Sequence, residues 1–436
     1  MSRTSRCAAL LIAVAAAASV ARAAERPAVV VTSGSDQSFR IALHRFAGGP
    51  DADEFRIGLR DALEYSNLFR EIDPKAFLGP TATSSFGVGA SIECLEWTTI
   101  GADVFVEGAL RIDGSDFVAE FGVWDLAGCV HKLRRRYRQA SSADPIILAR
   151  RMADDIVEEF TGVRGVSSTE LAFVSKRGGN PEIYVMGADG TNQRAATANQ
   201  SINNFPSWSP DGDAVVYTSY RTENRPMLYL STRGRGKPGR ILSKLSNMPL
   251  YRAVFAPIGR QLAIVMSPNG STELYRVRAD GKDLHRLTQN RAIDISPSWS
   301  PDGRRLAFVS DRSGTPQVYV MDANGSNVRR LTFDGSYNTS PSWSPDGSWI
   351  AYQCRVGMQF DIWLIDPEGD VNLPLISHPR SDESPSWSPD SRKIAFSSTR
   401  RGSAEIYVVD SSGNHLKRLT RGSRDDTSPS WGPHPR

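Results

Sequence analysis

The sequence Pro-Ser-Trp-Ser-Pro-Asp-Gly occurs at residues 206–212, 297–303 and 341–347. A near copy lies at 385–391, a shortened copy at 429–433 and a degenerate copy at 253–259. The aromatic residues of these copies follow one another at intervals of 47, 44, 44, 44 and 44 residues: Trp208, Phe255, Trp299, Trp343, Trp387 and Trp431. A repeat of this length and regularity indicates an array of similar structural units.

Each unit predicts four short antiparallel strands. The strand that ends in the aromatic residue runs into Ser-Pro-Asp-Gly, where Pro presets the backbone for a tight turn and Gly closes it. In one unit the second strand is Leu306–Ser310, the third is Val318–Met321 and the short fourth contains Leu331. Four strands in about 44 residues are typical of a propeller blade, which buries its faces between two neighbouring blades. We expect the repeated Trp to lie on the innermost strand and to pack between blades.

The phase of the repeat predicts how the ring closes. The first unit begins at Leu171 with a second strand, and the last unit ends at Trp431 with an inner strand. Residues Thr427–Trp431 are therefore expected to supply the missing inner strand of the first blade, which leaves no open sheet edge. The prediction is an all-β, six-bladed β-propeller over residues 166–436, closed by its own C-terminal strand.

The residues before the propeller carry no repeat and predict a small α/β domain at 24–165. The apolar periodicity and the turn and capping residues give two helices and five strands: Glu54–Asn67, Asp144–Thr161, Val29–Thr32, Ile41–Phe46, Val104–Arg111, Phe117–Asp125 and His131–Gln139. The segment 24–38 has no helical or core pattern and is expected to be a mobile N-terminal arm.

The N-terminus predicts export. Arg3 and Arg6 precede the apolar run Ala8–Val20, and Ala21-Arg22-Ala23 follows with small residues at the cleavage positions. Residues 1–23 are therefore interpreted as a signal peptide, since the run is shorter than the ~20 residues that span a bilayer. We expect a periplasmic, monomeric mature protein without direct membrane insertion.

The cysteines leave two alternatives open. In an oxidising compartment Cys94 and Cys129 could pair and leave Cys354 over, and three unpaired thiols are an equally weighted alternative. The sequence has no Cys-x-x-Cys, and its 6 histidines are scattered singly, which argues against a zinc site.

The charge does not favour nucleic acid. The net charge is only +4, and the most basic stretch, His131–Arg138, alternates with Leu133 and Tyr137 as a solvated strand face would.

Propeller geometry separates two faces. Because the innermost strands all run the same way, every Ser-Pro-Asp-Gly turn lies on one face, and every segment that leads into an aromatic strand lies on the other, which we call the entry face. The linker from the α/β domain joins the propeller on the Ser-Pro-Asp-Gly face, so the entry face is expected to be open to a partner.

Polar residues shortly before the aromatics are candidates for partner binding at this mouth. They are Asn203, Asn204, Arg252, Asp294, Asn338, Thr339, Asp382, Glu383, Asp425 and Asp426, with a break at Leu250 and Tyr251. The loops further out are basic: Lys176, Arg177, Arg221, Arg225, Arg312, Arg355, Arg400 and Arg401. An anionic ring made by Asp294, Asp382 and Asp426 could hold Ca²⁺ or the amines and amides of a peptide. The alternative is that these side chains cap turns and are solvated.

The signal peptide, the α/β domain and the six Pro-Ser-Trp-Ser-Pro-Asp-Gly units together resemble the TolB family of the periplasmic Tol–Pal envelope system, over essentially the whole mature chain. This resemblance implies a non-enzymatic adaptor that supports outer-membrane integrity and constriction at cell division. It implies that the propeller mouth binds the peptidoglycan-associated lipoprotein Pal and that the N-terminal arm binds the inner-membrane protein TolA. The positions of Pal contact in the family correspond here to Pro249, Arg252 and Ile295.

Two other classes of propeller protein are alternatives. A remnant propeller of a prolyl-oligopeptidase-like hydrolase would belong with a Gly-x-Ser-x-Gly nucleophile motif, and none occurs. A lectin-like propeller that binds a sugar or a cation would share the acidic mouth, so the sequence alone does not separate it from an adaptor.

Overall fold

The computed structural model describes residues 38–435 apart from 49, 78–91, 234, 243–244, 246–247, 259, 269 and 423. The expected signal peptide at 1–23 lies outside the described residues, as does the expected arm at 24–38 except for Ser38. In the described part of the chain, no helix is both long and apolar enough to cross a membrane.

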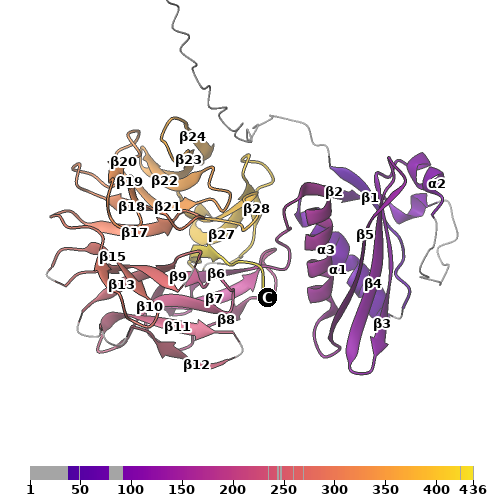
Figure 1. Ribbon diagram of the computed structural model, residues 1–436, viewed down its shortest axis with the longest axis horizontal. Helices are drawn as coiled ribbons and strands as arrows, with labels where there is room; N and C mark the ends of the chain where they lie inside the picture. Colours follow the sequence, from indigo (N-terminus) through magenta and orange to yellow (C-terminus); the bar gives the residue numbers. More distant parts are fainter. Residues whose placement is uncertain are drawn as a thin grey trace, which may run out of the picture. The chain divides into compact units, whose positions relative to one another are not determined.

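An α/β domain comes first and contains a five-stranded sheet in the order β2-β1-β3-β4-β5. Its elements are β1 (Phe39–Leu43), α1 (Pro50–Tyr65), β2 (Phe69–Glu71), a 3-10 turn (Pro74–Ala76), α2 (Cys94–Thr99), β3 (Val104–Asp113), β4 (Asp116–Asp125), β5 (Val130–Ala140) and α3 (Pro145–Thr161). Strand β1 pairs in parallel with β2 and β3, and the other pairs are antiparallel. Helices α1 and α3 cover one face of the sheet (Figure 1).

The period-2 pattern of β1 explains how the sheet buries both faces. Ile41 and Leu43 pack under α1 and α3, whereas Ala42 belongs to a smaller core on the other face, against which Trp97 of α2 packs. Helix α3 begins where the sequence predicts, because the side chain of Asp144 accepts a hydrogen bond of 2.8 Å from the backbone N–H of Ile146.

The disulfide alternative is confirmed, and it joins Cys94 of α2 to Cys129 in the turn between β4 and β5. The bond closes a loop with a sequence separation of 35 residues, which in the chain-entropy model corresponds to roughly 3–4 kcal/mol of stabilisation. Cys354 is buried and unpaired. The sequence analysis missed β2 and α2, since elements of 3 and 6 residues are too short to show periodicity.

The six-bladed propeller is confirmed, with six antiparallel sheets of four strands in the described residues. Blade 1 is β29 (Thr427–Trp431), β6 (Glu170–Gly178), β7 (Asn180–Gly187) and β8 (Arg194–Ala195). Blade 2 is β9 (Asn203–Trp208), β10 (Ala214–Thr222), β11 (Arg225–Thr232) and β12 (Arg235–Arg240). Blade 3 is β13 (Leu250–Phe255), β14 (Gln261–Met266), β15 (Glu273–Arg278) and β16 (His285–Arg286).

The last three blades follow the same order. Blade 4 is β17 (Asp294–Trp299), β18 (Arg305–Ser310), β19 (Gln317–Asp322) and β20 (Arg329–Arg330). Blade 5 is β21 (Asn338–Trp343), β22 (Ile350–Val356), β23 (Gln359–Ile365) and β24 (Asn372–Ile376). Blade 6 is β25 (Asp382–Trp387), β26 (Lys393–Arg401), β27 (Ser403–Asp410) and β28 (Lys417–Arg418).

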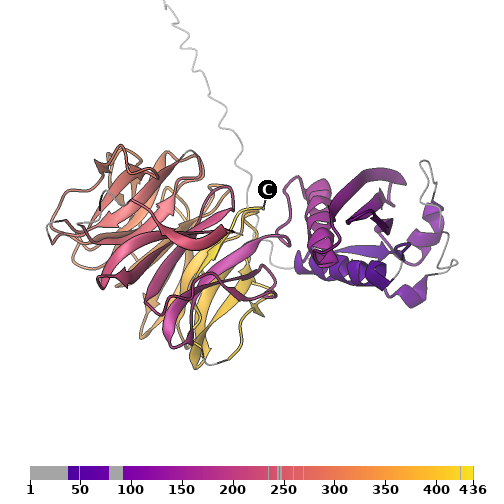
Figure 2. The ribbon, with the colours of Figure 1, turned by 90° about the horizontal axis from the view of Figure 1, so that it is seen from below.

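The predicted closure is also confirmed. Strand β29 pairs with β6, with Trp431 opposite Leu171 and Thr427 opposite Val174. Figure 2 shows the C-terminal strands in yellow beside the first strands of the propeller in magenta. The last strand of the chain thus completes the first blade.

The repeated motif is a set of hydrogen bonds, both within the turn and between blades. In blade 4 the side-chain oxygen of Asp302 accepts hydrogen bonds from the hydroxyl of Ser300 at 2.6 Å and from the backbone N–H of Arg304 at 3.0 Å. The hydroxyl of Ser298 accepts a hydrogen bond of 3.0 Å from the backbone N–H of Trp343 in the next blade. The Ser of Pro-Ser-Trp therefore links neighbouring inner strands, while the Ser and Asp of the turn satisfy its backbone.

One buried lysine in the propeller makes stability depend on pH. Lys393 is only 5% exposed at the start of β26, and burial lowers its pKa from 10.5 to about 8, against the opposing effect of Asp390 and Asp410. The unfolded chain therefore binds more protons at this site between about pH 8 and 10.5. The buried charge of Lys393 therefore destabilises the folded protein by its full amount below about pH 8. This destabilisation disappears as the pH rises from about 8 to 10.5.

We expect Lys393→Met to stabilise the protein at pH 7 by about 1–3 kcal/mol, because the long side chain stays and the buried charge is removed. The gain should shrink toward zero at pH 10.5. Urea unfolding of both chains at pH 7 and pH 10 measures this difference, with Lys282→Met, an exposed lysine on the same face, as the control. An equal gain at both pH values would contradict the prediction.

Candidate functional site

The residues five positions before each aromatic are buried, contrary to expectation. They are Asn203, Leu250, Asp294, Asn338, Asp382 and Asp426, each 0% exposed. The interpretation of Asn203, Asp294, Asn338, Asp382 and Asp426 as an accessible ring for a partner is therefore wrong. Thr339 is buried as well.

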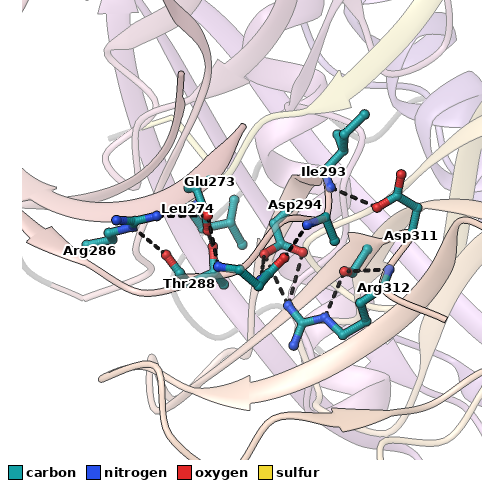
Figure 3. A network of polar contacts seen from close by, with 11 residues as sticks. Glu273, Leu274, Arg286, Thr288, Ile293, Asp294, Asp311 and Arg312 are labelled. Carbon is teal, nitrogen blue, oxygen red and sulfur yellow. Dashed lines mark hydrogen bonds and ion pairs between the residues drawn. The ribbon is translucent and has the colours of Figure 1, made fainter. Parts of the chain in front are cut away.

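Each of the three aspartates is paired with an arginine at the end of the second strand of its blade or just after it. The two oxygens of Asp294 lie 3.0 and 3.1 Å from Nη2 of Arg312 (Figure 3). Asp382 and Arg400 repeat this arrangement at 3.0 Å for both oxygens. In blade 1, Nη2 of Arg177 lies 3.3 Å from Asp426. We call these three contacts the Asp–Arg pairs.

The Asp–Arg pairs explain the burial in physical terms. A carboxylate buried without a partner is strongly destabilising, and an arginine fork supplies both charge and hydrogen bonds. In each pair the aspartate lies at or just before the start of the inner strand and the arginine at the end of the second strand or just after it, so the pair ties these two strand ends together on the entry face. Arg177, Arg312 and Arg400, expected to form a basic rim, serve this internal role instead.

A second buried acid supports the same loops. In blade 3, Glu273 accepts a hydrogen bond of 2.6 Å from the hydroxyl of Thr288 and one of 2.9 Å from Arg286, and this network lies beside the Asp294–Arg312 pair (Figure 3). The corresponding position, at or near the start of the third strand, is polar and buried in four of the other five blades: Glu182, Gln317, Asp361 and Glu405. In blade 2 it is the apolar Met227. The sequence analysis missed this position, although a Ser or Thr 15 or 16 residues later recurs with it.

The aspartates do not fit a calcium site. Each of Asp294, Asp382 and Asp426 belongs to a separate blade and already faces its own arginine. Among the residues with a described position, no group of three or more His, Cys, Asp or Glu side chains could hold a metal ion.

A cavity of about 620 Å³ lies among the innermost strands. Its lining includes the residue three positions before each aromatic: Phe205, Arg252, Ser296, Ser340, Ser384 and Ser428. Five of these, all except Arg252, have φ between 51° and 56° and precede a proline. This left-handed residue forms a bulge in the inner strand, which shifts its register against the second strand.

Exposed apolar side chains occur on the entry face in two neighbouring segments, the connection from blade 4 to blade 5 and the β22–β23 hairpin of blade 5. Phe333 is 70% and Met358 87% exposed, and Tyr337 and Val356 are also exposed. Phe333 and Tyr337 precede β21, while Val356 and Met358 belong to the β22–β23 hairpin, and the backbone N–H of Arg355 joins the two segments through the carbonyl of Tyr337 at 2.9 Å. We call these four residues the apolar rim. Tyr337 also lines the central cavity.

The remaining candidates are at the surface or partly buried. Asp425 pairs with Lys176 at 3.2 Å, with both side chains about half exposed (50% and 52%). Asn204, Arg252 and Glu383 are partly exposed, and burial raises the pKa of Glu383. Of the outer basic residues, Arg221 stacks 3.8 Å from the ring of Tyr229 and Arg225 lies 3.8 Å from Glu223, while Arg355 and Arg401 are exposed.

Comparison with known proteins gives matches to two protein families. Residues 157–435 match the family described as the TolB beta propeller domain, and residues 27–129 match the TolB amino-terminal domain. A Tol-Pal system protein TolB of Anaeromyxobacter dehalogenans (strain 2CP-1) is 38% identical over 302 residues, which cover 68% of each chain. The same protein of strain 2CP-C is 37% identical over 294 residues, and the match spans 66% of its length, about two thirds.

A solved structure supports the fold as a whole. The TolB of Acinetobacter baumannii has a TM-score of 0.75 and 22% sequence identity to the chain, over 92% of this chain and 97% of that one. At this identity the likeness concerns the fold alone, and it extends over both the α/β domain and the propeller.

Proposed function

The chain belongs to the TolB family, and from this we propose that it is a periplasmic, non-enzymatic adaptor of the Tol–Pal system. In this proposal the entry face of the propeller binds the lipoprotein Pal. The segment 24–38 binds an inner-membrane Tol protein such as TolA. The pair of contacts would couple outer-membrane and inner-membrane events during constriction.

The apolar rim is the observation that carries the assignment of the entry face. Exposed apolar side chains that gather in one place beside a cavity are typical of protein interaction sites, whereas single exposed ones are normal. On the Ser-Pro-Asp-Gly face, no blade has more than two exposed large apolar residues in its described turns: Ile258 and Leu284 in blade 3, Val328 in blade 4, Val371 in blade 5 and Leu416 in blade 6. The cation-binding alternative loses its basis, since the aspartates that suggested it are engaged by arginines.

We expect Phe333→Asp combined with Met358→Asp to weaken capture of purified Pal by more than tenfold. Two charges would then stand where an apolar contact should be buried, and truncation of central apolar contacts typically costs over 1 kcal/mol each. Pull-down with the immobilised mature chain measures the effect. Leu284→Asp combined with Val371→Asp, on the opposite face and 39% and 46% exposed, is the matched control.

The arm is tested in the same assay. A mature chain without residues 24–38 should keep Pal and lose the inner-membrane partner. Loss of both partners together would contradict the two-site proposal, and undiminished capture by the Phe333/Met358 variant would contradict the choice of face. Asp382 and Asp426 are unsuitable as probes of the surface, because they are buried in the Asp–Arg pairs.

A further inference from the structure

Arg252 interrupts the repeat inside the cavity. Four of the six blades have serine at this position, blade 2 has Phe205, and blade 3 has Arg252. Arg252 is followed by Ala253 where the others have proline, and it does not share their left-handed conformation. An arginine at this point is thus accompanied by a local change in the inner strand.

Arg252 has no acidic partner among the described residues. Its Nη1 donates a hydrogen bond of 3.2 Å to the hydroxyl of Ser296 in the next blade. Its guanidinium carbon lies 5.5 Å from the centre of the Phe205 ring in the preceding blade. Burial lowers its pKa from 12.5 to about 10, with no carboxylate near enough to raise it. The contrast with Arg177, Arg312 and Arg400 is plain, since each of these three has a buried aspartate.

The rest of the lining carries no charge. Apart from Arg252, the described residues around the cavity are Pro, Ser, Thr, Gly, aromatic and aliphatic residues. Ser296, Ser340 and Ser384 belong to this lining, and serine hydroxyls can donate to an anion. A single cation in a partly dehydrated cavity attracts an anion strongly and repels a metal cation.

We propose that the cavity accepts one carboxylate side chain, Asp or Glu, of the protein partner that docks on the entry face, and that Arg252 forms an ion pair with it. This inference rests on the proposed function and names the chemistry of the contact. The apolar rim adjoins the cavity through Tyr337, so a partner would present an acidic residue next to an apolar one. The guanidinium fork can hold such a carboxylate through two parallel hydrogen bonds.

The test measures binding of purified Pal ectodomain to the mature chain by calorimetry. Arg252→Gln should weaken binding at least tenfold and Arg252→Glu more. Arg260→Gln, an exposed arginine on the opposite end of the same blade, should leave binding unchanged. Changing the responsible acid of Pal to Lys should restore binding to the Arg252→Glu chain. Binding by Arg252→Gln at the wild-type affinity would overturn the proposal.

A second measurement separates this inference from the proposed function. The side-chain NMR signal of Arg252, assigned by its loss in Arg252→Gln, is followed during titration with N-acetylglutamate amide in the absence of Pal. If the chain does not bind Pal but this signal shifts, the adaptor proposal fails and the carboxylate site stands. If the signal moves neither with N-acetylglutamate amide nor with Pal, the carboxylate site is refuted whatever the chain binds.

Discussion

A chain that ends at Asp426 is expected to lose the folded propeller. The deletion removes β29, whose residues pair with β6 along blade 1. It also removes Trp431, which is buried, donates through Nε1 to the hydroxyl of Thr169 at 2.8 Å and contacts Ser386 of blade 6 through its backbone N–H at 2.9 Å. Loss of a buried Trp alone costs about 3–5 kcal/mol, and the strand hydrogen bonds add to this. The total is comparable to the whole stability of a typical domain, about 5–15 kcal/mol.

Thermal unfolding followed by far-ultraviolet circular dichroism measures the outcome. The matched control ends at Pro433, keeps all of β29 and should unfold cooperatively near the wild-type temperature. A synthetic peptide of residues 425–436, added to the chain that ends at Asp426, should restore a cooperative transition because it supplies the missing strand. A cooperative, unshifted transition without the peptide would show that β29 does not close the ring.

Asp382→Ala is expected to destabilise the protein by about 3–5 kcal/mol, because it leaves Arg400 buried without its partner. Burial raises the pKa of Asp382 in spite of Arg400. The cost of removing the carboxylate from water therefore outweighs the attraction of the arginine in this balance, and the pair is marginal as a source of net stability. Removing Asp382 alone leaves the charge of Arg400 buried without compensation, which is why a large loss of stability is expected.

Urea unfolding measures the change in the free energy of unfolding. Asp425→Ala is the control, because this aspartate also pairs with a basic residue but is about half exposed, and a change of about 0–1 kcal/mol is expected. Replacing both members, with Asp382→Leu and Arg400→Met, should recover most of the loss, since no buried charge remains. If Asp382→Ala and Asp425→Ala lowered the free energy of unfolding equally, burial of the Asp382–Arg400 pair would make no difference to stability.

These results bear on how a partner could be recognised. The entry-face loops are held from within by the Asp–Arg pairs and by the acids at the start of the third strands. The charges used in this way are not available to a partner. The proposed recognition therefore uses the apolar rim and Arg252, whose charge has no acidic partner within the described chain.

The sequence by itself determined the architecture of this protein. The six copies of the repeat set the number of blades, and the phase of the repeat set the closing strand, because both follow from the order of local elements along the chain. The direction of the inner strands then separated the two faces. Even the start of α3 followed from the local capping residue Asp144.

Only the tertiary structure decided which polar residues reach the surface. The sequence offered Asp294, Asp382 and Asp426 as an accessible ring for a partner or Ca²⁺. Asp294 and Asp382 are instead buried, each against an arginine 18 positions later, and Asp426 pairs with an arginine 249 positions earlier. The sequence marked Arg252 as a departure from the repeat, but only the structure places it in a cavity whose lining holds no other charge. The physical reason is that burial and pairing depend on what the neighbouring loops and blades bring alongside. A periodic pattern fixes where a side chain is placed and leaves open what it meets there.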